Sequence, residues 1–283
     1  MSQVINTNIA SLNAQRNLNG SQSALSTSIQ RLSSGLRVNS AKDDAAGLAI
    51  ASKMDAQVRG MNVAIRNAND GISLAQTGEG GLGKVTDMLQ RMRELATQAA
   101  NTTYSASDRS NLDAEYKTLG EEISRTLSST KFNGKAILGA DAGALTFQVG
   151  ANNTANDQIS ATTANMSTAS EVTKVLTGGS SVSISDTSGA LAKAAMTDID
   201  AALDKVNAER ATYGALQNRF ESVIGNLQVA SENTTAARSR IMDADFAKET
   251  AALTRAQILQ QAGTAMLSQA NQVPQQVLSL LPR

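Results

Sequence analysis

The 283-residue sequence contains neither cysteine nor histidine, and these absences exclude several kinds of site. Without cysteine the chain has no thiol nucleophile and no disulfide. Without histidine it has no imidazole base and lacks the commonest zinc ligand. A chain without cysteine is compatible with any redox compartment. These absences exclude thiol catalysis and imidazole acid–base catalysis, and together with the family resemblance given below they lead us to expect no enzyme, no catalytic residue, no cofactor and no metal ion.

An excess of charge of either sign is also missing. The 25 Lys and Arg residues equal the 25 Asp and Glu residues in number, so the basic excess of a nucleic-acid-binding protein is absent. No run of about 18 apolar residues occurs, and we expect no insertion into a membrane. Residues 1–10 have neither the basic start nor the apolar run of a secretory signal peptide. If the protein leaves the cell, we expect a route that cleaves no leader.

Aromatic residues are scarce. Tryptophan is absent, and the chain has three Tyr and four Phe residues. The large side chains that usually anchor a globular core are therefore few. Long helices joined by seams of Ala and Leu fit this composition better than a compact sandwich.

The chain does contain a long uncharged segment, residues 256–282. Two series with a spacing of seven interleave there: Leu259, Met266, Val273 and Leu280, and Ala256, Gly263, Ala270 and Val277. This is coiled-coil spacing, and the polar positions carry Gln, Asn, Ser and Thr where a solvated helix carries Lys and Glu. We predict a helix that other helices cover, disordered when alone and folded when partners arrive. Pro274 removes one helical hydrogen bond, so we expect a bend or an end near Ala270.

The amino terminus has the same character, because Arg16 is the only charged residue among residues 1–30. A helical stripe of aliphatic residues follows, with one slip in phase: Ile5, Ile9, Leu12, Leu25, Ile29, Leu32 and Leu36. We predict that the two termini pair with each other and with copies from neighbouring chains, so that these residues and the tail residues Leu259, Met266, Val273 and Leu280 form an assembly seam. The alternative is an ordinary buried helical hairpin within one subunit.

Charged helices lie between the termini. Residues 41–128 carry heptad patterns, with predicted helix starts at Ser40–Asp43 and at Ser107–Asp108. Regular helix returns near Thr197, and its apolar residues are spaced by seven as far as Ile241. A helix of this length needs a partner along its side, and we expect it to pack antiparallel to the helices of residues 41–128.

Residues 78–84 satisfy most of the phosphate-loop pattern, with Lys84 after Gly83. That loop needs a preceding strand and a Ser or Thr after the Lys, whereas a helical heptad precedes this segment and Val85 follows Lys84. A nucleotide hydrolase is therefore a minor alternative. We predict a loosened stretch between two helical segments, because glycine weakens a helix by roughly 1 kcal/mol.

The middle of the chain changes in pattern. Asn133-Gly134 predicts a tight hairpin turn, and residues 145–149 alternate apolar and polar as a strand does. From about Gly150 to Ser188, small polar residues dominate, and we predict a small, exposed, weakly cored β-rich insert, or partly a loop.

Together these patterns predict a mainly α fold, a long antiparallel helical coiled-coil bundle with paired amino- and carboxy-terminal helices and a small β-rich insert in the middle of the chain. We expect three parts: an inner terminal coiled-coil domain (1–40 and 242–283), a helical rod domain (41–140 and 190–241) and a surface insert (141–189).

Several long motifs are similar to those of a known family. They include Gln-Arg-Met-Arg-Glu-Leu-Ala at residues 90–96 and Arg-Ala-Gln-Ile-Leu-Gln-Gln-Ala-Gly at residues 255–263, with further matches at residues 5–10, 31–37, 41–50, 132–134 and 271–275. The chain resembles bacterial flagellin over roughly residues 1–150 and 195–283. The insert departs from the pattern, since it is short beside that of larger flagellins.

The resemblance implies a structural subunit of the flagellar filament for swimming motility, located outside the cell. It implies export in an unfolded state by the flagellar type III route and polymerisation at the distal end into a helical homopolymer. The implied partners are further copies of the chain, an export chaperone at the carboxy-terminal region, and the filament cap and hook-junction proteins. A flagellar hook-filament junction protein is the alternative. A protease embedded in the insert is not expected, because the histidines of its metal-binding helix are absent.

The resemblance also implies recognition by the vertebrate Toll-like flagellin receptor, an innate immune receptor of hosts. The matching positions are Arg91, Leu95 and Glu115. The simpler interpretation is that Arg91 and Glu115 are solvated charges and Leu95 a seam residue, and both interpretations are compatible with each other.

Overall fold

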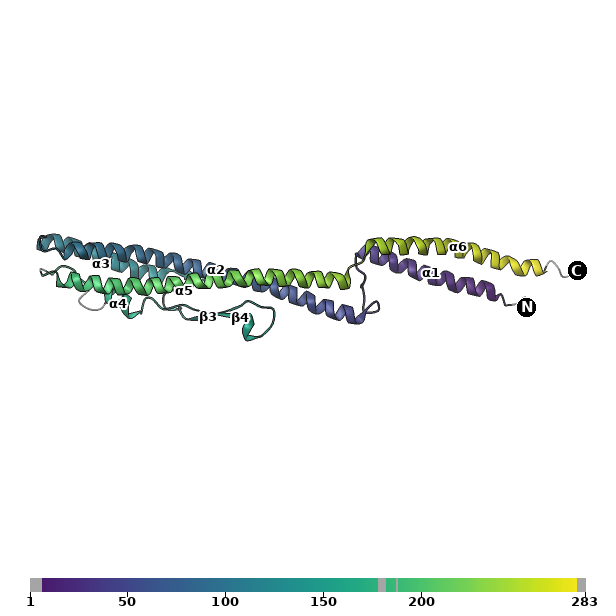
Figure 1. Ribbon diagram of the computed structural model, residues 1–283, viewed down its shortest axis with the longest axis horizontal. Helices are drawn as coiled ribbons and strands as arrows, with labels where there is room; N and C mark the ends of the chain where they lie inside the picture. Colours follow the sequence, from purple (N-terminus) through teal and green to yellow (C-terminus); the bar gives the residue numbers. More distant parts are fainter. Residues whose placement is uncertain (1–6, 178–181, 187, 279–283) are drawn as a thin grey trace. The chain divides into compact units, whose positions relative to one another are not determined.

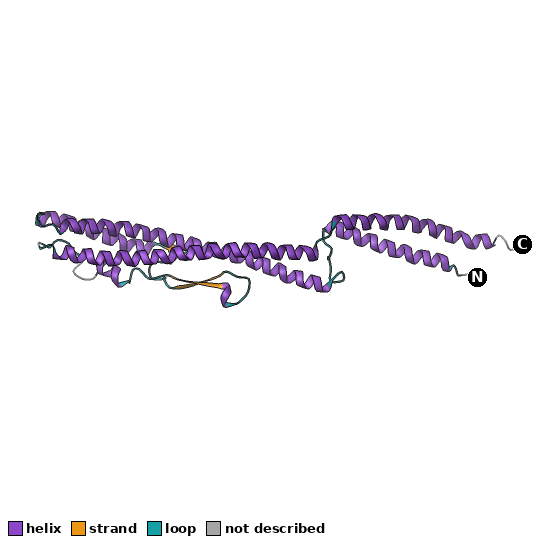
Figure 2. Ribbon diagram, viewed as in Figure 1, coloured by secondary structure: helices purple, strands orange, loops and turns teal. Residues whose placement is uncertain are grey.

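The computed structural model describes residues 7–177, 182–186 and 188–278, with side chains as far as residue 272. Helices dominate, and the short strands lie in the middle of the chain (Figure 2). The chain forms two compact units, a terminal unit of residues 1–56 and 233–283 and a central unit of residues 57–232. The mainly α fold with a small sheet insert is confirmed. The three-part division is a different description of the chain and stays a prediction.

Two helices make up most of the terminal unit, α1 (Ile9–Ser34) and α6 (Phe246–Leu278), and they lie side by side (Figure 1). The Asn8 side chain caps α1 by accepting from the Ser11 backbone N–H at 3.1 Å. Its Nδ2 also donates to the Ala270 carbonyl at 2.8 Å, close to the far end of α6. The two helices are therefore antiparallel, and the predicted pairing of the termini is confirmed within one chain.

The contact between α1 and α6 uses small residues at steps of three and four. On α1, half-buried or buried positions recur at Ser11, Ala14, Leu18, Ser21, Leu25, Ser28 and Leu32. On α6 they recur at Glu249, Leu253, Ala256, Gln260, Gly263, Leu267 and Ala270. A Cβ on Gly263 would lie 3.2 Å from the Leu18 side chain, so the small residues bring the two backbones close together. We call these positions the α1–α6 seam.

One ion pair joins the two helices, between Arg31 and Glu249 at 3.9 Å. Arg31 lies in the last turn of α1 and Glu249 in the first turn of α6. Each charge therefore complements the dipole of its own helix as well as its partner. This pair helps to fix which positions of the two helices face each other.

The segment that follows α1 and the segment that precedes α6 are hydrogen-bonded to each other beside this ion pair. Gly35, at a φ of 70°, ends α1 in the left-handed conformation that glycine adopts without strain. Leu36 then forms a β-bridge with Asp243, and the Ala244 N–H donates to the Gly35 carbonyl at 2.9 Å. The Arg37 guanidinium donates to the Ile241 carbonyl at 2.6 Å. Backbone hydrogen bonds thus link the segment after α1 to the segment before α6.

Two expectations for helix boundaries are wrong by a few residues. Helix α2 (Ala45–Ala99) begins after the predicted Ser40–Asp43 start, because Asp43 folds that segment into a turn and Asp44 caps the helix through the Gly47 N–H at 2.8 Å. Helix α3 (Ala106–Ser129) is capped by Ser105, which forms a capping box with Asp108.

Helix α6 continues through Pro274 to Leu278, so the alternative of an end near Ala270 is wrong. A bend there, caused by the hydrogen bond that proline removes, stays a prediction.

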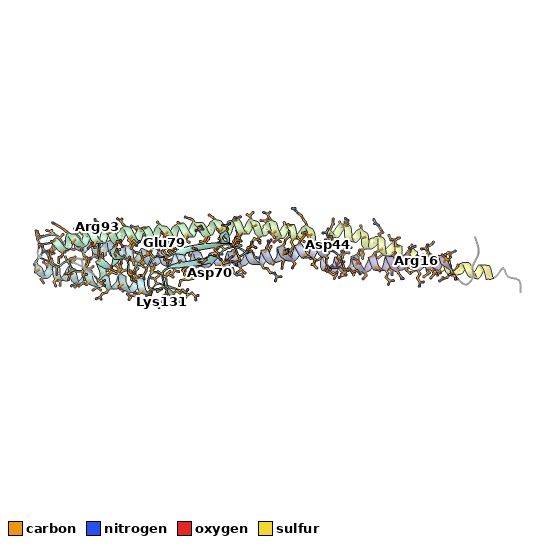
Figure 3. The ribbon with its side chains drawn as sticks, turned by 90° about the horizontal axis from the view of Figure 1, so that it is seen from below. Arg16, Asp44, Asp70, Glu79, Arg93 and Lys131 are labelled. Carbon is orange, nitrogen blue, oxygen red and sulfur yellow. The ribbon has the colours of Figure 1, made fainter. Side chains whose placement is uncertain are left out.

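The core of the central unit lies among α2, α3 and α5 (Ala190–Met242), which begins seven residues before the predicted Thr197. Arg93 of α2 pairs with Asp200 of α5 at 2.6 Å, and the Gln217 amide of α5 donates to Glu79 of α2 at 2.9 Å. Residues later in α2 thus meet residues earlier in α5, which confirms the antiparallel packing. Figure 3 labels Arg93 and Glu79, the α2 members of these two contacts.

The loosened stretch predicted at residues 78–84 is wrong, because α2 is helical without a break from Ala45 to Ala99. The cost of glycine is offset by packing at two of these positions. A Cβ on Gly78 would lie 2.7 Å from the Tyr213 ring, and one on Gly81 would lie 2.8 Å from Thr130 Oγ1. Leu82 and Val85, which follow these two glycines, are fully buried. The continuous helix also leaves no loop that could surround a phosphate, which removes the basis for the nucleotide hydrolase.

Two antiparallel hairpins follow α3, the first just before the insert and the second within it. Strands β1 (Lys131–Phe132) and β2 (Lys135–Ala136) are joined by Asn133 at φ 49° and Gly134 at φ 82°, as the Asn-Gly pair predicts. Strands β3 (Ala144–Gln148) and β4 (Gln158–Thr162) pair next, with the one-turn helix η1 (Ala155–Asp157) just before β4. The short helix α4 (Ser170–Leu176) follows.

The insert is better packed than its composition indicates, so the prediction of an exposed, weakly cored segment is wrong. Its buried apolar residues reach the cores formed by the helices: Val149, Ile159, Ala161, Met166, Val172, Val175 and Ile184. Side chains of the helices also hold its backbone. Glu209 accepts from the Ala164 N–H at 2.9 Å, and Asp113 accepts from the Ile184 N–H at 2.7 Å. Isolated aliphatic residues among Ser, Thr and Ala are thus enough to attach it.

Candidate assembly and recognition surfaces

The terminal unit leaves large apolar side chains in solvent. Its exposed members include Ile9, Leu12, Ile29, Ile50, Phe246, Ile258, Leu259 and Met266, with exposed fractions between 48% and 69%. Among the described residues of this unit, the buried apolar ones are Val38, Ala51 and Ala256, and of these Val38 has the largest side chain. Large apolar side chains gathered on the surface of one unit indicate sites of protein–protein contact. We call these eight residues the exposed apolar set.

The structure divides the predicted assembly seam into two groups. Leu25 and Leu32 lie in the α1–α6 seam, and Leu36 is half-buried in the connection after α1. Five others belong to the exposed apolar set: Ile9, Leu12, Ile29, Leu259 and Met266. Ile5 and Leu280 lie outside the described residues, and Val273 lies in α6 beyond the last described side chain.

Leu259 and Met266 lie directly beside the α1–α6 seam, each one residue before a seam position. The sequence reasoning followed the large residues and assigned the seam to their phase. The seam residues on α6 are Ala256, Gly263 and Ala270 of the interleaved series together with Glu249, Leu253, Gln260 and Leu267, and on α1 the sequence prediction did not include Ser11, Ala14, Leu18, Ser21 and Ser28. Their steps of three and four were visible in the sequence, but small polar residues were not counted as contact positions.

The second surface is a charged cluster on α2 and α3. Arg91 donates to Glu115 Oε1 and to Glu94 Oε2, both at 2.9 Å. These hydrogen bonds, to Glu94 first and then to Glu115, raise the pKa of the Arg91 guanidinium above its usual range. The structure therefore brings the predicted receptor residues Arg91 and Glu115 together, with about half of each side chain exposed.

Leu95 is placed differently from the other two predicted receptor residues. Its side chain is 1% exposed and belongs to the core of the central unit. It therefore lies beneath the charged cluster inside the same chain, and not at a surface where it could pack one subunit against another.

Both surfaces lack what a catalytic site requires. The terminal unit offers aliphatic side chains and amides, and the charged cluster consists of mutually paired Arg and Glu side chains. Long helices packed along one another, with large apolar side chains left exposed, indicate a structural protein. Within the described residues, no helix has both the length and the apolar character needed to cross a bilayer.

Comparison with known proteins agrees with this class and identifies the family. The family model for the bacterial flagellin N-terminal helical region matches residues 5–143, and the model for the bacterial flagellin C-terminal helical region matches residues 196–281. The chain belongs to the bacterial flagellin family. It is a structural protein of the flagellar filament, outside the cell, and not an enzyme.

Individual relatives support the assignment over the full length. The chain is 45% identical to flagellin of Halalkalibacterium halodurans, over 98% of this chain and 99% of the relative. It is 42% identical to flagellin of Bacillus subtilis, with the same coverage. A putative flagellar hook-associated protein from Vibrio parahaemolyticus shares the fold, with a TM-score of 0.57 at 14% identity, over 71% of this chain and all of that one.

Proposed function

We propose that this flagellin polymerises through the exposed apolar set of its terminal unit. The observation that carries the proposal is the contrast within α6, where Ala256 is 4% exposed while Leu259 and Met266 are 51% and 65% exposed. Burying such side chains against further copies contributes roughly 1.5–3 kcal/mol for each one. Polar uncharged neighbours suit this burial, because amides cost less to remove from water than charges do.

The test is the double variant Leu259→Ser, Met266→Ser, with Gln257→Ala as the matched control on the same helix. Purified monomer is seeded with filament fragments and examined by electron microscopy. We expect long uniform tubes from the wild type and from the control, and a strong loss of polymer from the double variant. Full polymer yield from the double variant would show that these side chains lie outside the contact. Persistent wild-type monomers would favour the alternative, a hook-filament junction protein.

Export in an unfolded state by the flagellar type III route is a second part of the proposal. The terminal unit supports it, because its thin seam of small residues gives α1 and α6 little reason to stay folded in one chain. We expect the helix content measured by circular dichroism to rise on polymerisation, and no rise would contradict this part. The charge-introducing variant Gln257→Lys, Gln261→Lys, Gln269→Lys should impair assembly or export, and unchanged filament yield and motility would reject that expectation.

The proposed partners other than the chain itself are an export chaperone at the carboxy-terminal region and the filament cap and hook-junction proteins. The exposed apolar residues of α6 support a chaperone, since unprotected apolar helix faces associate without specificity. A binding measurement with Leu259→Ser, Met266→Ser tests whether a chaperone and a second copy use the same face. Loss of both interactions is the expected result.

We also propose recognition by the vertebrate Toll-like flagellin receptor through the Arg91–Glu115 cluster, with Leu95 beneath it. The pairing and the half-exposure of the two charged residues support this proposal. Arg91→Ala should lower receptor signalling by the monomer. The matched control is Arg125→Ala, which removes another exposed Arg of the central unit, paired with Glu122. An equal dose response for wild type and both variants would reject the proposal.

A further inference from the structure

Two aromatic side chains of α5 occupy the places of missing side chains on α2. A Cβ on Gly71 would lie 2.6 Å from Phe220 Cζ, and a Cβ on Gly78 would lie 2.7 Å from Tyr213 Cζ. Neither distance is possible for a real Cβ, so each ring requires glycine at its position. Phe220 is 1% exposed and Tyr213 is fully buried. Gly71 and Gly78 are seven residues apart, and so are Tyr213 and Phe220.

This spacing matters because a heptad seam defines which helix faces meet but not their axial offset. Helix α2 has 55 residues and α5 has 53. A slip of seven residues keeps the same faces in contact and displaces one helix by about 10 Å, at 1.5 Å per residue. The polar pair Arg93–Asp200 favours the observed offset, but both side chains are half-exposed, and such pairs add little.

The two rings distinguish the observed offset from both neighbouring ones. A slip in one direction would place Phe220 against Gly78 and Tyr213 against Val85. A slip in the other direction would place Tyr213 against Gly71 and Phe220 against Ala64. Val85 and Ala64 are at most 1% exposed, so neither offers room for a ring. Each slip therefore produces one overlap and leaves one glycine without a ring, and overpacking of this kind costs about 1–3 kcal/mol or more.

We propose that the Phe220–Gly71 and Tyr213–Gly78 pairs select the axial register of α2 and α5. The remaining helix seam provides affinity between the two helices, and the two ring–glycine pairs provide its unique offset. A subunit of a regular polymer benefits directly, because every copy then presents its surfaces at the same spacing. The ring hydroxyl has no part in this, since the Tyr213 hydroxyl is buried without a hydrogen-bond partner among the described atoms.

The absence of native cysteine allows a direct test with spin labels. Labels at Asp87→Cys on α2 and Glu221→Cys on α5 occupy exposed positions, and the distance between them follows the offset. We expect one narrow distance in the wild-type background. In Tyr213→Leu, Phe220→Leu we expect a second population shifted on the order of 10 Å, or a broad distribution, while circular dichroism still shows helix.

Two controls separate register from stability. Tyr213→Phe keeps the ring and should retain the single wild-type distance. The milder variant Tyr213→Leu, with Phe220 intact, serves if the double variant does not fold, and it should broaden the distance distribution. A helical Leu variant that keeps the single narrow distance would overturn the proposal, as would an equal broadening in Tyr213→Phe.

Discussion

The terminal and central units are built from the same kind of heptad helices, yet they bury their apolar residues to very different extents. The central unit encloses large side chains such as Leu89, Met92 and Tyr116 at no more than 1% exposure. The terminal unit buries mainly small residues and leaves Ile258 and Met266 more than half exposed. A heptad contact between two helices is therefore not enough to bury all of their large apolar side chains. The central unit gains its core from α3 and the insert, whereas α1 and α6 of the terminal unit have no third long helix packed along them in the described part of the chain.

The strongest test of this contrast is the same substitution in both units. Leu89→Ala removes a fully buried side chain of the central unit and should lower the free energy of unfolding by about 2–5 kcal/mol. Leu259→Ala removes a side chain that is 51% exposed in the monomer, and should change the free energy of unfolding by less than about 0.5 kcal/mol. Urea unfolding of the monomer, followed by circular dichroism, measures both. Equal losses would mean that the terminal unit has a core of its own.

A second test concerns glycine inside the central unit. Gly78→Ala places a Cβ 2.7 Å from the Tyr213 ring and should destabilise the protein by about 1–3 kcal/mol. Gly80→Ala is the matched control two residues away. No atom lies within 4 Å of its Cβ position, so it should stabilise α2 by up to about 1 kcal/mol. Thermal unfolding shows whether each substitution raises or lowers the stability. If both substitutions changed the stability in the same direction, the packing role of Gly78 would be refuted.

A smaller effect is expected at the start of α3. Ser105→Ala removes the side chain that accepts from the Asp108 N–H at 3.2 Å, and should cost about 1 kcal/mol. Asn8 has the corresponding role at the start of α1 in the terminal unit. Because that unit has little core, Asn8→Ala should fray α1 locally without changing global unfolding. Hydrogen exchange of the first turn of each helix checks both expectations.

The smallest effect is a difference in pH dependence between these two caps. Hydrogen bonds from the Ser105 hydroxyl and backbone N–H lower the pKa of the Asp108 carboxyl below 3.8. Because the folded pKa lies below the unfolded one, the stabilisation is present above pH 3.8 and is lost as the pH falls through the folded pKa. The stability gap between wild type and Asp108→Asn should therefore close in acid. The Asn8 cap does not titrate, so α1 should show no such change, and a gap that does not narrow as the pH falls below 3.8 would contradict this account.

Local patterns in the sequence predicted much of the fold. The heptads located the long helices, and Asn133-Gly134 located a hairpin turn, because both signals involve neighbouring residues. The failures have non-local causes. The helix through Gly78 depends on a ring 135 positions later in the chain, and the buried state of Met166 and Ile184 depends on helices that the insert itself does not contain.

The α1–α6 seam and the two exposed surfaces were predicted only in part, because they too depend on contacts between residues far apart in the sequence. Periodicity identified Leu259 and Met266 as contact residues, but it could not distinguish a contact within the chain from a contact with another copy. On hydrophobicity alone, the larger residues were expected in the contact between α1 and α6 of one chain. The close approach of these two helices instead requires small residues there, such as Ala256 and Gly263. Leu95 and Arg91 occur in one motif and lie four residues apart on α2, yet the short aliphatic side chain of Leu95 is in the core and the Arg91 guanidinium reaches the surface.

The two hydrogen-bonded segments that contain Leu36 and Asp243 affect how a mechanical force passes through the terminal unit. Any tension or torque carried between the α1–α6 pair and the parts of α2 and α5 in the terminal unit passes through two backbones at once. These backbones are fastened to each other by the Leu36–Asp243 bridge, by Ala244 and by the Arg37 guanidinium. Two cross-linked strands share a load and resist twisting more than a single linker does. A rotating shaft built from such subunits would transmit torque through a coupling that is doubled in every copy.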